Sequence, residues 1–220
     1  MPATPKPQPV NKLAGTLRHR LLLAIESFKV LDKVMLGKAL TLAEETHAKQ
    51  TRRPTKENPT QAAPYIVHPM RVALIITEEL ELKEPIAIAA ALLHDTVEAS
   101  NGKVTIAYIE EHFGRPIAMM VSILTKPTFK ETASKEEKEQ KLRIYHERIS
   151  QASVETKLVK LADRLDNVRD AAELLDKGFQ LRYLEQTRAF YLPIADVSDS
   201  YLFDELSLAC ERLEHELKYG

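Results

Sequence analysis

The chain has 220 residues, which suits one domain and is enough to bury a core of its own. Its 31 Lys and Arg residues nearly balance its 32 Asp and Glu residues, which excludes a global charge field that would recruit nucleic acid or an anionic membrane. The single Cys210 excludes an internal disulfide and fits a reducing compartment, so we expect a cytoplasmic protein. Apolar stretches such as 86–93 are too short for a membrane span, which needs roughly 20 apolar residues.

Residues 1–11 are expected to form a disordered tail, because prolines recur there and the apolar core of a signal peptide is missing. Residues 12–220 are expected to form a single domain. Apolar residues recur mainly at spacings of three and four, which predicts an all-α fold, a helical bundle of about eight to ten helices. The predicted helices span 12–31, 33–50, 69–81, 84–98, 104–112, 114–125, 135–149, 153–176 and 180–217.

Prolines mark several helix boundaries. Pro69 and Pro85 stand where a first-turn proline is tolerated, and Pro193 is expected to kink or break the last helix. Two long polar connections, 52–63 and 126–134, are either functional loops or exposed linkers.

His94 and Asp95 close a strongly apolar helix. Adjacent helical residues diverge by about 100°, so the two side chains can bind one ion only by converging across it from the helix end. An isolated His-Asp pair can equally be a surface feature or a satisfied polar contact. Its interpretation therefore depends on other parts of the chain.

Two further segments offer ligand-type side chains. His68 stands at a predicted helix start, where an imidazole can point into a cavity, although taken singly it would be read as an N-terminal cap. Asp163 lies beside the apolar face formed by 158, 161, 162, 165 and 168, where an unpaired carboxylate would be costly. Two imidazoles and two carboxylates suit manganese, iron, zinc or, less well, magnesium. Such an ion permits hydrolysis of a phosphate ester at neutral pH.

Three motifs resemble the hydrolase domain of the RelA/SpoT family, in particular the small alarmone hydrolases. They read A-P-Y-I-V-H-P at 63–69, A-A-L-L-H-D-T-V-E at 90–98 and K-L-A-D-R-L-D-N-V-R at 160–169. The resemblance is ordered and runs over about 42–169. It implies an HD-domain bundle that degrades the alarmones of the stringent response. The implied reaction is hydrolysis of the 3′-pyrophosphate of guanosine tetra- or pentaphosphate, ppGpp or pppGpp, to GDP or GTP and pyrophosphate.

The resemblance also implies roles for individual residues. The metal ligands would be His68, His94, Asp95 and Asp163, usually with Mn²⁺ in this family, although another divalent metal would suit them. Glu98 would be a general acid or base. The substrate contacts would be Arg52 and Arg53 at the base, Asn167 and Arg169 at the nucleotide, and Lys126 at a phosphate. Plainer interpretations are surface charge for the two arginines at 52 and 53, solvation for Lys126, and a helix cap or bridge for Asn167. Arg164, which lies in the same motif, could pair with a structural carboxylate instead of contacting the nucleotide.

The chain departs from the family pattern at two places. Ala99 stands where the family has a second acidic residue after Glu98, and residues 54–63 form a longer connection without glycine. Two alternatives therefore remain open: a phosphohydrolase of another nucleotide or nucleotide cofactor, and a nucleotide-binding regulatory protein with weakened turnover. Only about fifty residues follow Arg169, so we expect a hydrolase without a synthetase module. The sequence indicates no oligomeric state and no protein partner.

Overall fold

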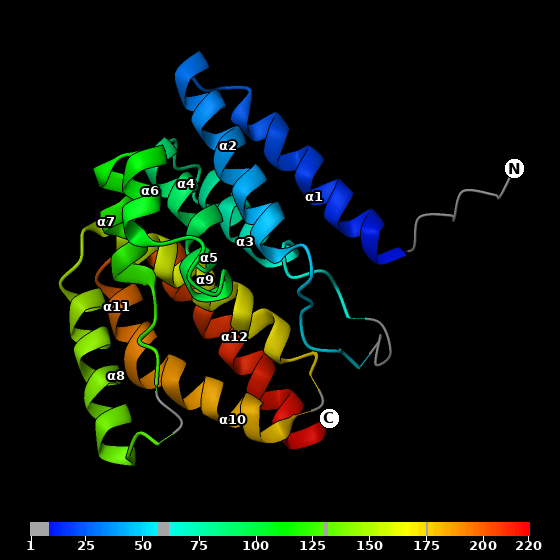
Figure 1. Cartoon of the computed structure of the whole chain (residues 1–220). Coiled ribbons are helices and arrows are strands. Elements are labelled where there is room, and N and C mark those ends of the chain that lie inside the picture. Colours follow the sequence, from blue (N-terminus) through cyan, green and yellow to red (C-terminus); the bar gives the residue numbers. More distant parts are fainter. Residues whose placement is uncertain (1–8, 57–61, 130–131, 175) are drawn as a thin grey trace, which may run out of the picture.

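A computed structural model describes residues 9–56, 62–129, 132–174 and 176–220. Within these ranges the regular structure is helical, and β-pairing is confined to isolated bridges. The predicted all-α bundle is therefore confirmed (Figure 1). Its elements are α1 (Pro9–Ile25), α2 (Val30–His47), α3 (Val67–Leu74), the π-helical turn η1 (Ile75–Glu79), α4 (Pro85–Leu93), α5 (Thr96–Ala99), α6 (Ile106–Phe113), α7 (Arg115–Leu124), α8 (Lys135–Ser150), α9 (Val154–Ala171), α10 (Lys177–Gln186), the π-helical turn η2 (Thr187–Tyr191), α11 (Leu192–Asp196) and α12 (Ser200–Tyr219).

Helix α4 forms the centre of the bundle. All its residues from Ala87 to Leu93 are buried, and it packs against α2, α3, α7 and α9. A helix that is apolar on every side must be enclosed by others, and the small alanines of α4 allow those helices to approach closely. Helices α3 and α9 also contact each other. The three helices that carry the predicted metal ligands therefore meet in the core.

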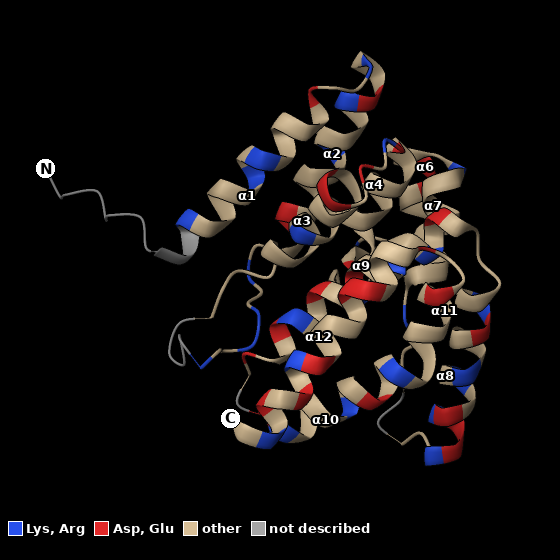
Figure 2. Cartoon of the chain, turned by 180° about the vertical axis from the view of Figure 1, so that it is seen from behind, with Lys and Arg blue, Asp and Glu red and all other residues tan. Residues whose placement is uncertain are grey.

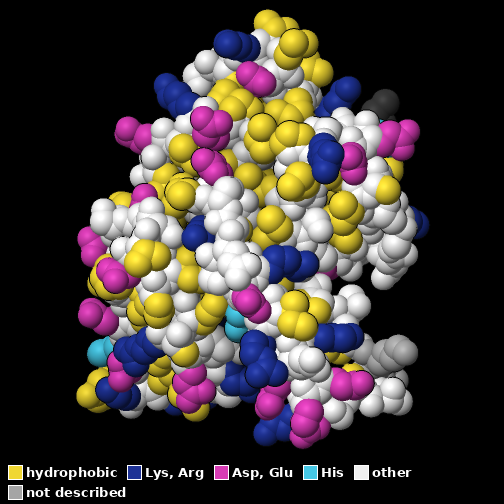
Figure 3. Space-filling model, turned by 90° about the vertical axis from the view of Figure 1, so that its left-hand side faces the viewer, with side chains coloured by type: hydrophobic (Ala, Val, Ile, Leu, Met, Phe, Trp, Pro, Cys, Tyr) yellow, Lys and Arg dark blue, Asp and Glu magenta, His cyan; other side chains and the backbone are white. Residues whose placement is uncertain are grey.

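The surface of the bundle mixes charged and apolar side chains. Helices α1 and α2 form a hairpin on one side, and α10 to α12 cover the other (Figure 1). Helix α8 carries alternating blue and red segments in Figure 2, as expected for a solvated face. The face in Figure 3 bears charges of both signs among apolar side chains, in line with the near-zero net charge. No helix in the described ranges is long and apolar enough to cross a membrane.

Several predicted boundaries differ from the structure. Helix α1 includes residues 9–11, which we had expected in the tail, whereas residues 1–8 lie outside the described residues. It ends at Ile25, and α2 already begins at Val30.

The helix predicted over 180–217, with a kink or break at Pro193, is interrupted at a later position. Pro193 stands at the second position of α11, where its missing N–H is tolerated. The chain instead breaks at 197–199, and α12 starts where the carboxylate of Asp199 accepts a hydrogen bond from the backbone N–H of Leu202.

Candidate metal centre and adjoining pocket

Two imidazoles and two carboxylates converge in the core. His94 Nε2 lies 3.1 Å from Asp95 Oδ2, and His68 Nε2 lies 3.2 Å from Asp163 Oδ1. The crossed distances, His68 Nε2 to Asp95 Oδ2 and His94 Nε2 to Asp163 Oδ1, are 3.7 and 3.8 Å. All four side chains are buried. We call these four residues the ligand cluster.

A turn between α4 and α5 brings His94 and Asp95 together. The helix predicted over 84–98 is in fact two helices, because α4 ends at Leu93 and α5 begins at Thr96. The hydroxyl of Thr96 donates to the carbonyl of Leu93 at 2.7 Å and stabilises the turn. The adjacent side chains therefore converge from the helix end, as the sequence required.

The tautomers of both histidines suit metal binding. His94 Nδ1 lies 2.8 Å from the carbonyl of Ala91, which can only accept a hydrogen bond, so Nδ1 carries the proton. His68 Nδ1 lies 2.6 Å from Asp166 Oδ2, a carboxylate oxygen that accepts a hydrogen bond, so this Nδ1 also carries a proton. In the neutral form of each imidazole, Nε2 therefore presents a lone pair to the cluster. His94 Nε2 is buried without a hydrogen-bond partner, which a bound cation would supply.

The electrostatics of the ligand cluster favour a positive ion. Burial lowers the pKa of His94, but the carboxylates of Asp95 and Asp163 outweigh it and raise the pKa to about 9. Burial raises the pKa of both carboxyls, yet the neighbouring cations hold each pKa well below its usual range. The donor set therefore fits a divalent metal ion.

Lys160 lies beneath the ligand cluster. Its ammonium donates to Asp163 Oδ2 at 2.7 Å and sits 5.5 Å from the ring centre of Tyr145. Burial lowers the pKa of Lys160, but Asp163 and the tyrosines raise it well above its usual value, so the side chain stays charged. Sequence reasoning missed this residue, although a lysine three positions before a buried aspartate on a helix is a usable signal.

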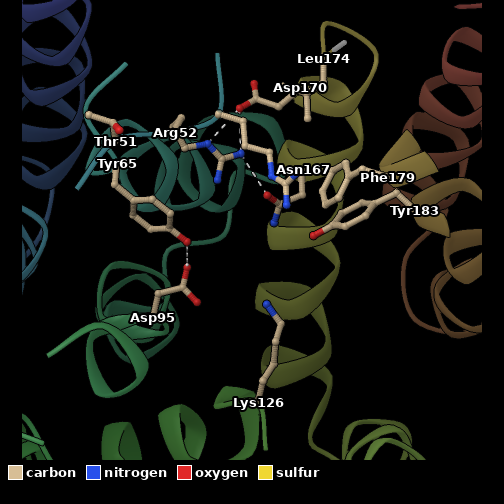
Figure 4. A pocket seen from close by; sticks show the side chains of 11 residues that line it. Thr51, Arg52, Tyr65, Asp95, Lys126, Asn167, Asp170, Leu174, Phe179 and Tyr183 are labelled. Carbon is tan, nitrogen blue, oxygen red and sulfur yellow. Dashed lines mark hydrogen bonds and ion pairs between the residues drawn. The ribbon is translucent and has the colours of Figure 1, made fainter. Parts of the chain in front are cut away.

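A cavity of about 340 Å³ adjoins the ligand cluster (Figure 4). Asp95 lies at its base, where the Tyr65 hydroxyl donates to Asp95 Oδ2 at 2.6 Å. The walls combine cations with aromatic rings, a combination typical of nucleotide pockets. The lining residues are Thr51, Arg52, Arg53, Tyr65, Asp95, Lys126, Asn167, Asp170, Leu174, Phe179 and Tyr183.

Backbone pairing places the two arginines at this pocket. The N–H of Arg52 donates to the carbonyl of Ala63 at 2.7 Å, and the N–H of Tyr65 donates to the carbonyl of Gln50 at 2.9 Å. The segments on either side of the long connection are thus held together, while its residues 57–61 lie outside the described residues. Arg53 stacks 4.0 Å above the ring centre of Phe179.

Asn167 links the pocket to the ligand cluster. Its side-chain oxygen accepts from Arg52 Nη2 at 3.0 Å, and its nitrogen donates to Asp163 Oδ1 at 2.6 Å. Both ends of the amide are therefore engaged with the protein, and Figure 4 shows the contact with Arg52.

Glu98 does not line the pocket but contacts Lys126, which does. Glu98 Oε1 accepts from the backbone N–H of Lys126 at 2.7 Å. Burial raises the pKa of Glu98 above its usual value, while the charge of Lys126 opposes the shift. The ammonium of Lys160 and desolvation lower the pKa of Lys126, but three nearby carboxylates raise it by more, so Lys126 stays charged.

The structure does not bring Arg169 to the pocket. Its guanidinium donates to Glu79 at 3.1 Å and to Glu205 at 2.7 Å, away from the lining residues. Asn167 lies toward the pocket and Arg169 does not, because residues two apart on a helix point about 200° apart. Arg164 bonds the hydroxyl of Thr187 and the carbonyl of Tyr183 rather than a carboxylate.

Ala99 does not line the pocket at Asp95; it lines a second cavity. This cavity lies between the end of α2 and α6, and its walls include Gln50, Ser100 and Tyr108. The position that lacks the second acid therefore faces a different cavity from the one at Asp95.

Sequence reasoning assigned no site role to Tyr65, Asp166, Asp170, Phe179 or Tyr183. Tyr65 stands in the motif that contains His68, and the two aspartates follow Asp163 by about one and two helical turns, so spacing could have identified them. The two aromatics lie on α10, beyond the motifs, and only the packing of α10 against α9 brings them to the pocket.

A helical bundle around two buried histidines and two buried aspartates is an HD-type arrangement, and the chain belongs to the HD-domain family, whose model matches residues 39–198. Among its relatives is guanosine-3′,5′-bis(diphosphate) 3′-pyrophosphohydrolase MESH1. The Xenopus tropicalis protein is 34% identical over 155 residues, which are 70% of this chain and 79% of that protein. The human protein is 35% identical over 137 residues, 62% of this chain and 72% of that protein.

Two more matches extend the comparison. The GTP pyrophosphokinase rsh of Brucella ovis is 34% identical over 180 residues, which are 81% of this chain but only 22% of that protein. A solved structure described as a metazoan ortholog of SpoT that hydrolyzes ppGpp matches with a TM-score of 0.64 at 24% identity, over 81% of this chain and 94% of that one. This structural match supports the fold, and the family match together with the MESH1 relatives identifies the chain as a hydrolase of the HD type.

Proposed function

We propose that the chain hydrolyses the 3′-pyrophosphate of ppGpp or pppGpp, giving GDP or GTP and pyrophosphate. One observation carries this proposal: Asp95 belongs both to the ligand cluster and to the lining of a pocket with cationic and aromatic walls. A phosphate at the base of this pocket would lie beside the cluster while a base occupied its outer part. MESH1 relatives whose names state this activity support the choice of substrate.

We propose Mn²⁺ as the ion held by His68, His94, Asp95 and Asp163. Such an ion supplies neutralisation of phosphate charge and a lowered pKa of bound water. The protein contributes the geometry, because Asp166 and the carbonyl of Ala91 fix the two imidazoles. The Tyr65 hydroxyl fixes Asp95 in the same manner.

The pocket residues would bind and orient the nucleotide. Arg53 and Phe179 offer a stacked pair on which a guanine can lie, and Arg52 is held in place by Asp170 and Asn167. Lys126 would bind a phosphate of the substrate.

Glu98 is the proposed proton-transfer group. In hydrolysis, the oxygen of water forms a new bond to phosphorus, the bond from phosphorus to the 3′ oxygen breaks, and that oxygen takes up a proton. Glu98 contacts Lys126, which lines the pocket, and would accept the proton from water or pass it to the 3′ oxygen.

The test is pyrophosphate release from ppGpp by the purified chain with Mn²⁺. We expect release by the wild type, loss in His94→Ala, and wild-type release in the matched control His19→Ala, whose histidine is exposed on α1. A wild type that releases no more pyrophosphate than His94→Ala would overturn the proposal. Other nucleotides and nucleotide cofactors, assayed in parallel for phosphate release, test the alternative substrate class.

Ala99 favours a second candidate function, a nucleotide-binding regulator with weakened turnover. Loss of a general acid or base typically costs on the order of 10²- to 10⁴-fold in rate. A single-turnover reaction with excess protein distinguishes the candidates, because the regulator would bind ppGpp tightly without forming pyrophosphate. A gain of rate in Ala99→Asp would identify the missing carboxylate as the cause.

A further inference from the structure

Two arginines and two aspartates alternate in a continuous charge network beside the ligand cluster. We call Arg52, Arg71, Asp166 and Asp170 the Arg–Asp network. Arg52 donates to Asp170 Oδ2 through Nε at 3.1 Å and through Nη2 at 2.8 Å. Arg71 Nη2 donates to both oxygens of Asp170 at 2.8 Å. The Nε atom of Arg71 lies 2.7 Å from Asp166 Oδ1, an ion-pair contact rather than an aligned hydrogen bond.

The network reaches two parts of the site, and Arg52 also makes a longer contact with Asp166, because its Nη2 lies 3.9 Å from Asp166 Oδ2. At one end, Asp166 accepts from His68 Nδ1 and so orients a predicted metal ligand. At the other end, Asp170 holds Arg52, whose side chain lines the pocket (Figure 4). Arg71, on α3, stands between the two aspartates but neither lines the pocket nor belongs to the ligand cluster.

We propose that Arg71, Asp166 and Asp170 are positioning residues that couple the metal centre to the nucleotide pocket. This inference rests on the proposed function, since it assigns these side chains a task at the same site. Asp166 fixes the ring of His68, Asp170 fixes the guanidinium of Arg52, and Arg71 fixes both carboxylates relative to each other.

The physical basis of the coupling is charge in a buried setting. The side chain of Asp166 is only 4% exposed and that of Arg52 only 13% exposed. Asp170 and Arg71 are 25% and 30% exposed, so dependence on a charged partner is strongest at Asp166 and Arg52, where little water is available to replace it. A carboxylate that orients a ligating histidine typically changes metal affinity 10- to 100-fold when it is removed, so about that effect is expected at Asp166.

Three substitutions separate the two ends of the network. Asp166→Asn should weaken Mn²⁺ binding about 10- to 100-fold and leave nucleotide binding within about threefold. Asp170→Asn should do the reverse, with nucleotide binding about tenfold weaker because Arg52 loses its 2.8 Å charged partner and keeps only the longer contact with Asp166. Arg71→Met should weaken both. Arg71→Lys keeps the charge but cannot reach both carboxylates, so it should recover only part of each loss.

The measurements are calorimetric titrations with Mn²⁺ alone and with ppGpp in EDTA, alongside urea unfolding. The matched control is Arg18→Met. It removes the 2.8 Å ion pair between Arg18 on α1 and Glu44 on α2, and neither residue belongs to the Arg–Asp network. Arg18→Met should change stability at most modestly and change neither affinity.

An Arg71→Met protein that is less stable yet binds Mn²⁺ and ppGpp like the wild type would overturn the proposal. Equal effects of the two aspartate variants on both ligands would also overturn it, because the ends of the network would then not be separable. If the wild type bound Mn²⁺ but did not hydrolyse ppGpp, the proposed function would fail. The Mn²⁺ titrations of Asp166→Asn and Arg71→Met against Arg18→Met would then still decide the coupling.

Discussion

Lys160 is a buried charge whose removal should have a measurable effect on stability and metal binding. Its side chain is 4% exposed, and its ammonium is 2.7 Å from a carboxylate that is 5% exposed. Removing one partner of such a buried pair costs about 3–5 kcal/mol, because the other charge is left without compensation. Lys160→Met removes both the ion pair with Asp163 and the ammonium that lies 5.5 Å from the ring centre of Tyr145, while it keeps an apolar side chain of similar length, so the electrostatic loss should dominate. We therefore expect a loss of about 3–5 kcal/mol in the free energy of unfolding in EDTA.

Mn²⁺ should reduce this loss. A divalent cation in the ligand cluster would compensate the charge of Asp163. In Lys160→Met this cation would also no longer be repelled by the ammonium of Lys160. A ligand present at 100 times its Kd stabilises the folded state by about 2.7 kcal/mol. Tighter binding lowers Kd and raises this stabilisation, so at equal concentration Mn²⁺ should stabilise the variant more than the wild type.

Urea unfolding with EDTA and with Mn²⁺ measures both effects. Lys157→Met, one turn earlier on α9 and partly exposed, is the matched control and should lose less than about 1 kcal/mol. The reasoning is refuted if Lys160→Met loses no more stability in EDTA than Lys157→Met does.

Three further predictions concern the site itself. Glu98→Gln should lower kcat on the order of 10²- to 10⁴-fold. Burial raises the pKa of Glu98, so as a general base the wild type should lose kcat when the pH drops through that raised pKa, whereas as a general acid it should lose kcat when the pH rises through it. A kcat–pH profile of the variant that keeps the wild-type limb would contradict either role. Burial lowers the pKa of His94 but the neighbouring carboxylates raise it to about 9. Since Mn²⁺ must displace that proton, its calorimetric affinity should rise with pH by up to about tenfold per unit between pH 6 and 8, and a flat profile would argue against His94 as a ligand. Phe179→Leu should raise KM for ppGpp about tenfold with kcat nearly unchanged, because a stacking ring is lost; initial-rate kinetics would count against the base site if only kcat fell.

Helical periodicity and ligand chemistry made much of this structure predictable. The apolar run 86–93 predicted a buried helix, and residues 87–93 are buried, whereas Ile86 is 38% exposed. Convergence of His94 and Asp95 from the helix end was also predicted, but the turn that produces it was not, because the sequence pattern predicts one continuous helix over 84–98. His68 and Asp163 join them because α3 and α9 pack against α4.

The pocket was less predictable because its walls come from distant segments. Arg169 matched a family motif, yet its position on α9 turns it toward Glu79 and Glu205. Phe179 follows the last motif and reaches the pocket only through tertiary packing. Helix ends were also misplaced where a capping residue such as Asp199 outweighed a continuous periodic pattern.

Identification of the products formed from ppGpp with Mn²⁺ tests the proposed hydrolysis most directly. Phosphorus NMR of the reaction should show GDP and pyrophosphate in equal amounts, and no product should form with Asp163→Asn. Release of inorganic phosphate instead, or equal product formation by Asp163→Asn, would contradict cleavage of the 3′-pyrophosphate at this metal centre.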